Sequence, residues 1–337
     1  MLNDQWNIIK KLTPYRIWNL ILLGYSYLLA KHFKRSTAIG KPFSASIEPT
    51  TACNLACPEC PSGLKEFTRP TGKLKLETNE EMLKQLGKQL FYINYYFQGE
   101  PFLNPEFLEF VKQAHKRKIY TATSTNGHFI TKKKAEEVVS SGLDRLIISI
   151  DGLTQKTYEQ YRRQGKLSKV IEATEFMVDA KKKLKSKTPH LIFQFLVVAP
   201  NEHEVEEVFE LGKKLGVDEV RLKTAQLYNY KHGNPLMPEN EKYARYRKMS
   251  DGTYKLKYKL GDHCWRMWSS TVLTWDGSVI PCCFDKDAKH KLGNISESSF
   301  SEIWKMPRYQ SFRKSVFTDR KSIDICKNCS EGAKVWT

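Results

Sequence analysis

The segment Cys53-Asn54-Leu55-Ala56-Cys57-Pro58-Glu59-Cys60 places three cysteines at C-x3-C-x2-C spacing. Three thiolates this close in sequence can hold three irons of a [4Fe–4S] cluster, whereas a closed cluster site supplies four cysteines. The fourth iron would keep an open position, and an open position on a metal is where a substrate or cofactor binds. The spacing therefore predicts a redox site in which one iron is available to a bound molecule.

A zinc site or a disulfide framework would explain the triplet less well. Zinc sites usually combine C-x2-C pairs with a fourth ligand, but the nearest histidine is His32 and the other cysteines lie beyond position 260. Disulfide frameworks are typical of short secreted domains, whereas this chain has 337 residues, of which 27% are charged. The eight cysteines therefore favour metal ligation in a reducing compartment, and we expect a cytoplasmic protein.

From Phe43 onward, strand-like and helix-like segments alternate. Strands are predicted at 44–47, 92–97, 119–124, 146–150, 191–198 and 219–224, and helices at 78–90, 105–117, 131–141, 154–163, 168–185 and 202–215. Thr78 and Glu81 have the spacing of a capping box at the start of the first helix. The alternation predicts an α/β fold with a parallel sheet and right-handed crossovers. Functional side chains then belong at the carboxyl ends of the strands, and the triplet follows the first strand.

A cysteine triplet in this position resembles the radical S-adenosylmethionine (SAM) superfamily. The resemblance implies a partial (β/α)6 TIM-like barrel in which Cys53, Cys57 and Cys60 hold a SAM-binding [4Fe–4S] cluster. SAM would bind the open iron through its amino and carboxylate groups. Its reductive cleavage would yield methionine and a 5′-deoxyadenosyl radical that abstracts hydrogen from a substrate. A reducing partner such as flavodoxin or ferredoxin would supply the electron.

The later strand ends extend the resemblance. Gln98-Gly99-Glu100-Pro101 is similar to the family's Gly-Gly-Glu-Pro motif, which implies that Gly99 and Glu100 engage the amino group of SAM. Positions that approach the SAM ribose and carboxylate in relatives are occupied by Asn126, Ser149 and Asp151. Each motif alone is a common turn signal, but their order on successive strand ends favours a SAM site.

Arg162 matches the arginine that pairs with the SAM carboxylate in relatives, a role that suits a bidentate guanidinium. Its neighbour Arg163 remains an alternative. The family usually has an aromatic residue before the third cysteine, where it packs on adenine, and this chain has Glu59 there. Adenine stacking is therefore unassigned, with the segments 198–201 and 222–225 as regional candidates.

Four later cysteines form a second set. Predicted strands at 270–272 and 279–281 flank an Asp276-Gly277 turn, which is typical of a β-hairpin. The hairpin would bring together two of the four cysteines, and a C-x2-C pair would close the site; the set is Cys264, Cys282, Cys326 and Cys329.

This arrangement resembles the SPASM/twitch extension of radical SAM enzymes, including the pattern of Cys, twelve residues, Gly277, four residues and Cys. The resemblance implies one auxiliary [4Fe–4S] cluster, with a structural zinc site as the alternative. Cys283 is left over. It is either an inert buried thiol or a hydrogen-atom donor beside the radical, as in radical SAM epimerases.

The first 43 residues contain an apolar stretch of 14 residues, at 17–30, between basic flanks. It is shorter than the ~20 residues that a membrane span needs. We expect it to lie on an anionic membrane surface, or to cover the core or a dimer partner. The net charge of +18 comes without a recognisable nucleic-acid-binding module, so no nucleic-acid partner is expected.

Three regions are therefore predicted: a basic, apolar helical segment at 1–43, the barrel at 44–228, and a connection with the auxiliary cluster domain at 229–337. We expect a radical SAM oxidoreductase that oxidises a small or lipid- or sugar-linked metabolite, with the auxiliary cluster as electron acceptor. Peptide-maturing relatives often carry a recognition domain before the barrel, for which 43 residues are too few. A peptide or protein maturase and a Cys283-dependent epimerase remain alternatives, as does a non-enzymatic, metal-binding scaffold at the membrane surface.

Overall fold

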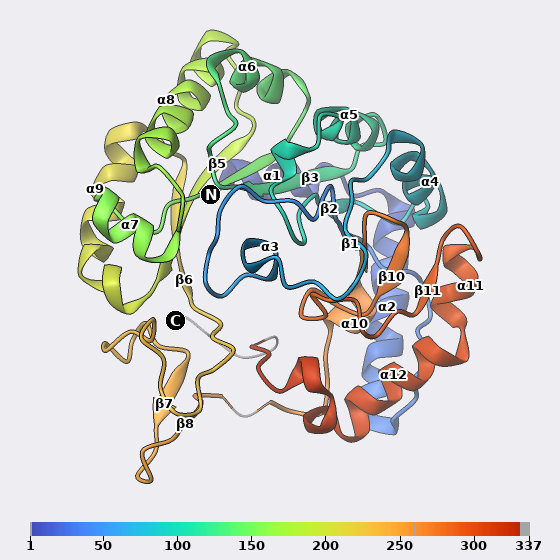
Figure 1. Cartoon of the computed structure of the whole chain (residues 1–337). Coiled ribbons are helices and arrows are strands. Elements are labelled where there is room, and N and C mark those ends of the chain that lie inside the picture. The colour runs from blue at the N-terminus through green and yellow to red at the C-terminus, as the bar shows by residue number, and fades with distance from the viewer. Residues whose placement is uncertain (1, 259, 331–337) are drawn as a thin grey trace.

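The computed structural model describes residues 2–258 and 260–330, and its centre is one nine-stranded sheet with the order β11-β10-β9-β1-β2-β3-β4-β5-β6. Neighbouring strands from β1 to β6 are all parallel. These six strands are β1 (Ser44–Ile47), β2 (Tyr92–Asn94), β3 (Tyr120–Thr125), β4 (Arg145–Ser149), β5 (His190–Val197) and β6 (Glu219–Thr224). Figure 1 shows them curving into an open barrel with helices on the outside. The predicted α/β fold is confirmed.

The helices cover the outer face of the sheet because alternate strand residues are apolar on that side. Leu191, Phe193 and Phe195 of β5 are fully buried in the core, whereas Gln194 and Leu196, on the opposite face of the strand, point to the barrel interior and are only partly buried. The outer elements are α4 (Leu76–Leu86), α5 (Phe107–Lys116), α6 (Lys132–Ser140), α7 (Gln155–Tyr161), α8 (Leu167–Lys183) and α9 (Val205–Leu215).

Three predicted helix starts differ from the structure by two or more residues, and one of them belongs to the helix predicted from 105, which begins at Phe107. The first helix begins at Leu76 rather than Thr78, because Leu76 already packs on the core. Its N-cap residue is Lys75, whose side chain has no acceptor to cap the helix. It ends before Gly87, which adopts φ +80° and so stops the helix. The helix predicted from 202 begins instead as a 3-10 turn, η2 (Ala199–Glu204), and α9 follows it. The remaining short elements of the barrel are α3 (Pro61–Leu64) and η1 (Pro101–Leu103).

The first region forms α1 (Leu2–Ile9) and α2 (Pro14–Phe33). Asp4 of α1 is buried and accepts hydrogen bonds from Tyr120 and Arg145, which start β3 and β4. Helix α1 therefore lies at the amino ends of the strands. No helix among the described residues is long and apolar enough to cross a membrane.

The C-terminal region extends the same sheet. Its hairpin, β9 (Ser270–Leu273) and β10 (Ser278–Ile280), is antiparallel as predicted. Unexpectedly, β9 also pairs in parallel with β1, from Ser44 opposite Ser270 to Ile47 opposite Leu273. The other elements are β7 (Tyr246–Lys248), β8 (Tyr254–Leu256), α10 (Arg266–Ser269), β11 (Gly293–Asn294), α11 (Phe300–Lys305), α12 (Pro307–Thr318), η3 (Arg320–Ser322) and η4 (Asp324–Cys326). The predicted region also includes residues 259 and 331–337, which lie outside the described residues.

Candidate active site

The three clustered cysteines lie in the loop that leaves β1, residues 48–60, here called the triplet loop. Figure 1 shows this loop and α3 across the mouth of the barrel. Cys57 is buried, Cys53 and Cys60 are half-buried, and none of the three forms a disulfide. Burial raises the pKa of Cys53 to about 11, so iron would have to displace a proton from this thiol to bind its thiolate.

A buried ion pair anchors the triplet loop at its start. The Glu48 carboxylate, fully buried, accepts hydrogen bonds of 2.9 and 2.6 Å from Arg69, and the backbone N–H of Trp275 donates to it at 3.3 Å. Burial raises the pKa of Glu48, and Arg69 opposes that rise. Glu48 therefore joins the triplet loop to the β9–β10 turn. The sequence contains no signal for this pair, because its partners lie 21 residues apart in separate loops.

The segment that follows β2 contacts the triplet loop through its backbone. Gly99 has φ +73°, and a Cβ there would lie 2.2 Å from the Thr50 carbonyl oxygen. Its N–H donates to the Ser62 hydroxyl at 2.8 Å, and the next N–H, of Glu100, donates to the Ala52 carbonyl at 2.8 Å. Only glycine fits this conformation and this close backbone approach.

Glu100 and Asn126 link β2 and β3 to the triplet loop. The buried Glu100 carboxylate accepts from the Thr125 hydroxyl and from the Asn126 N–H, both at 2.8 Å. Burial raises the pKa of Glu100 to about 7, although these donors lower it. The Asn126 amide nitrogen donates to Asn54 at 2.7 Å and lies 3.9 Å from the Cys53 sulfur. The structure thus brings both residues to the first cysteine.

Asp151 and Arg162 reach the second cysteine. The buried Asp151 carboxylate accepts from Arg162 Nε at 2.5 Å and from the Leu196 N–H at 2.7 Å. This leaves the Arg162 NH1 group 3.9 Å from the Cys57 sulfur. Arg163 is exposed, and only its carbonyl group contacts the triplet loop, at the Ala56 N–H. Ser149 is buried at the end of β4, in register with Gln194 of β5.

Glu59, which occupies the usual aromatic position, binds the chain that follows β6. Its carboxylate accepts from the Tyr228 N–H at 2.8 Å and from the Asn234 side chain at 3.1 Å. Sequence reasoning noted Glu59 only as a departure from the family pattern. A carboxylate in that place fixes the segment after β6 to the triplet loop.

The four later cysteines also come together. Cys264, Cys282, Cys326 and Cys329 line one small cavity, beside Arg320. The Arg320 guanidinium lies 3.4 Å from the Cys329 sulfur. Among the described residues, no group of three or more Cys, His, Asp or Glu is arranged to hold a single metal ion. Four thiols from three separate segments suit the four-cysteine ligation of an iron–sulfur cluster.

Cys283 does not line that cavity but contacts Arg266, which does. Its sulfur is 3.7 Å from Arg266 NH1. Burial raises the pKa of Tyr96, which follows β2, to about 12, and Cys283 contributes to this rise. The thiol therefore lies on the barrel side of the auxiliary cysteines.

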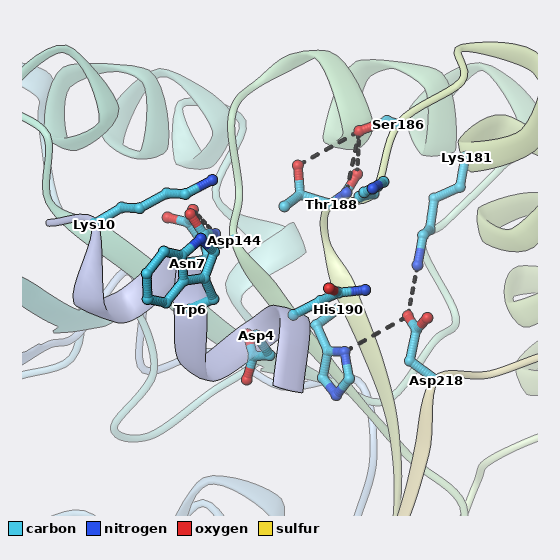
Figure 2. Close-up of a pocket in the computed structure, with 12 residues that line it drawn as sticks. Asp4, Trp6, Asn7, Lys10, Asp144, Lys181, Ser186, Thr188, His190 and Asp218 are labelled. Carbon is cyan, nitrogen blue, oxygen red and sulfur yellow. Dashed lines mark hydrogen bonds and ion pairs between the residues drawn. The ribbon is translucent and has the colours of Figure 1, made fainter. Parts of the chain in front are cut away.

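Two cavities mark opposite ends of the barrel. The larger, of about 610 Å³, lies beneath α1 and is lined by structural groups such as Asp144, His190 and Asp218 at the amino ends of the strands (Figure 2). A cavity of about 390 Å³ lies at the other end, between the segment that follows the triplet loop and the C-terminal region, and Pro61, Tyr228 and Lys286 line it. None of the triplet cysteines lines the second cavity, but Pro61 and Phe284, which follow Cys60 and Cys283 in the chain, do.

Comparison with known families agrees with this geometry. Residues 47–221 match the model described as "Radical SAM superfamily". The chain belongs to the radical SAM superfamily. Residues 264–330 match the SPASM model, described as "Iron-sulfur cluster-binding domain". The family thus implies SAM, its [4Fe–4S] cluster and auxiliary iron–sulfur ligation for this enzyme, and the cysteine sets above fit these groups.

Individual relatives share this radical SAM architecture at low identity. The PqqA peptide cyclase of Gluconobacter oxydans is 25% identical over 313 residues, which cover 88% of this chain and 84% of the relative. The crystal structure of BtrN in complex with AdoMet and 2-DOIA has a TM-score of 0.53 at 20% identity, covering 87% of this chain and 94% of that one. Streptococcus suis SuiB bound to the precursor peptide SuiA has a TM-score of 0.63 at 15% identity, with 91% and 75% covered. These structures show the shared fold.

Proposed function

We propose that this radical SAM enzyme abstracts a hydrogen atom from a substrate bound between the triplet loop and Cys283. When bound, the cluster and SAM supply a 5′-deoxyadenosyl radical after one-electron reduction, for which a flavodoxin or ferredoxin is the expected donor. The observation that carries the proposal is that Asn126, at the end of β3, and Arg162, at the end of α7, converge on Cys53 and Cys57.

Each residue of the mouth has a positioning role in this proposal. Asp151 holds the Arg162 guanidinium by its Nε, so that its other nitrogens can pair with the SAM carboxylate. Gly99 lets the backbone approach the triplet loop closely enough for Glu100 to be held beneath it. We expect the amino group of SAM to bind at this strand end.

We further propose that the reaction is an oxidation. The substrate loses a hydrogen atom to the radical, and the remaining substrate radical then loses a proton and one electron. Cys264, Cys282, Cys326 and Cys329 would hold the auxiliary cluster, which would supply the acceptor for that electron. The adjacency of Cys282 and Cys283 supports this route, because Cys282 lines the auxiliary cavity and Cys283 lies near Tyr96, which follows β2.

A small or sugar-linked metabolite is the first candidate substrate and a peptide the second. The peptide candidate is supported by the name of the PqqA peptide cyclase and by the peptide complex of SuiB. If Cys283 returned a hydrogen atom to the substrate, the product would be an epimer of unchanged mass. Mass spectrometry of the product after turnover separates these cases, since dehydrogenation removes two hydrogens.

Anaerobically purified protein should be brown and hold about seven or eight irons per chain, as two four-iron clusters require. It should cleave SAM when dithionite is added. Iron analysis, absorption spectroscopy and chromatography of 5′-deoxyadenosine measure these three properties. Colourless, zinc-loaded protein that leaves SAM intact would overturn the proposed function and favour a scaffold role.

The outer face of α2 supports a further proposal, concerning location. Its inner face is part of the core: Leu23 and Ala30 are fully buried, and Tyr27 packs edge-on against Trp268 with ring centroids 5.8 Å apart. The opposite face is apolar as well, with Trp18, Ile21, Tyr25 and Leu28 all more than half exposed. Most of the large apolar side chains that the described residues expose lie between positions 6 and 39.

We infer that this face rests on an anionic membrane surface. Exposed cations border it, at Lys10, Lys31, Lys34 and Arg35. The only acidic residue before Glu48 is Asp4, which is buried and paired with Arg145. A second copy would bring the same positive charges against this face, whereas anionic lipid attracts them. Because α1 lies at the amino ends of the strands, this contact gives no support to a lipid-linked substrate.

Replacing Trp18, Ile21 and Tyr25 together by serine should weaken binding to vesicles of phosphatidylcholine and phosphatidylserine by at least about tenfold, because three apolar anchors are lost. Co-sedimentation measures this, and added salt should weaken wild-type binding. The matched control replaces Leu184 and Phe209, which are similarly exposed elsewhere. Deleting α2 would expose core and is not a clean test. Equal binding by both variants, or loss of a dimer instead of vesicle binding, would contradict the proposal.

A further inference from the structure

Strand β6 presents two cations to the barrel interior. Val220 and Leu222 pack on the apolar core, and Val220 lies so close to Gly212 of α9 that a Cβ on that glycine would be 2.5 Å from it. Because strand residues alternate in direction, Arg221 and Lys223 point inward. Glu219 binds Arg221 with contacts of 2.5 and 2.9 Å. Lys223 has no carboxylate partner among the described residues.

Lys223 lies within a group of cations rather than beside an acid. Its side chain reaches solvent in the barrel mouth. Burial nevertheless lowers its pKa, Arg245, Arg221 and Arg266 lower it further, and Cys283 raises it. Like charges in a partly desolvated space disfavour one another, so this arrangement is costly unless an anion enters it.

Three further cations lie near this strand: Arg245 and Arg266 lower the pKa of Lys223, and Arg245 also lowers that of Lys286. The Arg245 Nε atom lies 3.4 Å from the Thr224 hydroxyl, and the buried NH1 group of Arg245 has no hydrogen-bond partner among the described residues. Arg266 contacts Cys283, as described above. Lys286 donates to the Tyr228 hydroxyl at 2.8 Å and lies 4.8 Å above that ring.

Lys286 also connects this group to the two cysteine sets. It contacts Tyr228, whose N–H donates to Glu59 of the triplet loop. Burial lowers the pKa of Lys286, and the nearby Cys60 and Cys283 raise it. The nearby carboxylate of Glu59 is already occupied by Tyr228 and Asn234. We define the four side chains Lys223, Arg245, Arg266 and Lys286 as the cation cluster.

We propose that the cation cluster binds a polyanionic group of the substrate, of the phosphoryl or polycarboxylate type. The inference rests on the proposed function in one respect: it takes the substrate to bind between the triplet loop and Cys283. The NH1 group of Arg245 has lost solvation that a bound anion would restore, and charge-assisted hydrogen bonds are the strong ones. Anchoring the anionic group there would hold the rest of the substrate between the triplet loop and Cys283.

The test is calorimetric titration of the full, iron–sulfur-loaded protein with inorganic pyrophosphate and, separately, with citrate. Lys223→Gln and Lys286→Gln should each weaken binding of one or both anions by about tenfold, the cost of losing one hydrogen bond to a charged group. Lys223→Arg keeps the charge and should retain most of the affinity. A preference for pyrophosphate would indicate a phosphorylated substrate, and a preference for citrate a carboxylate one.

Lys182→Gln is the matched control, because Lys182 is an exposed lysine on α8. This substitution lowers the net charge of +18 by the same one unit. Thermal unfolding of each variant identifies any that fail to fold. If Lys223→Gln does not fold, the comparison of Lys223→Arg with wild type takes its place. The inference is overturned if neither anion binds, or if Lys182→Gln weakens binding as much as Lys223→Gln. SAM cleavage is assayed separately on wild-type protein, so a failed proposed function and a failed anion site give different results.

Discussion

Replacing Cys57 by alanine should abolish SAM cleavage and remove the iron of the triplet site, while about four irons remain at the auxiliary site. Cys57 is the buried member of the triplet, and Arg162 lies 3.9 Å from its sulfur. Two cysteines leave two irons of a four-iron cluster without thiolate ligands. The auxiliary cysteines line their own cavity with none of the triplet among them, so they should retain their cluster.

Iron analysis, absorption spectra and 5′-deoxyadenosine formation measure the two effects. The reciprocal control is Cys282→Ala, which should lose the auxiliary iron and keep the triplet iron. Independent loss of the two clusters is not guaranteed by the fold, because the two regions are in contact: β9 pairs with β1, and Trp275 contacts Glu48. Loss of all iron from both variants would mean that the two sites assemble as one unit.

Replacing Arg69 by methionine should lower the free energy of unfolding by about 3–5 kcal/mol, because it leaves a buried carboxylate unpaired. Glu48 is fully buried and Arg69 nearly so, with side-chain exposures of 0% and 8%. Without Arg69, the pKa of Glu48 should rise further above its usual value. The loss of unfolding free energy in Arg69→Met should therefore be larger at neutral pH, where Glu48 is ionised. It should shrink as the pH falls and the carboxylate takes up a proton.

Urea unfolding of wild type and variant measures this difference. The control is Lys169→Met, which breaks the exposed pair between Lys169 and Glu172, with exposures of 51% and 46%, and should cost less than about 1 kcal/mol. The double variant Arg69→Met with Glu48→Gln should recover part of the loss, since it removes the unpaired charge. If Arg69→Met is no more costly than the control, the pair does not anchor the triplet loop.

The family, the parallel sheet and the order of the site motifs could be predicted from the sequence because each depends on local spacing. Cysteines at C-x3-C-x2-C, a Gly-Glu-Pro turn after the second strand and an Asp-Gly turn in the hairpin are fixed by neighbours a few residues away. Parallel strands then bring their carboxyl ends to one edge of the sheet. That rule predicted that Gly99, Asn126, Asp151 and the triplet would lie near one another.

The tertiary structure decided the features that join distant segments. No pattern in the sequence indicates three of these contacts. They are the pairing of β9 with β1, the ion pair of Glu48 with Arg69 and the contact of Glu59 with the chain after β6. The sequence likewise does not indicate that α2 exposes an apolar face or that Lys223 points into the barrel. Periodicity divides a helix or strand into faces, but which face meets the core depends on the neighbouring elements, and their positions follow from burial over the whole chain.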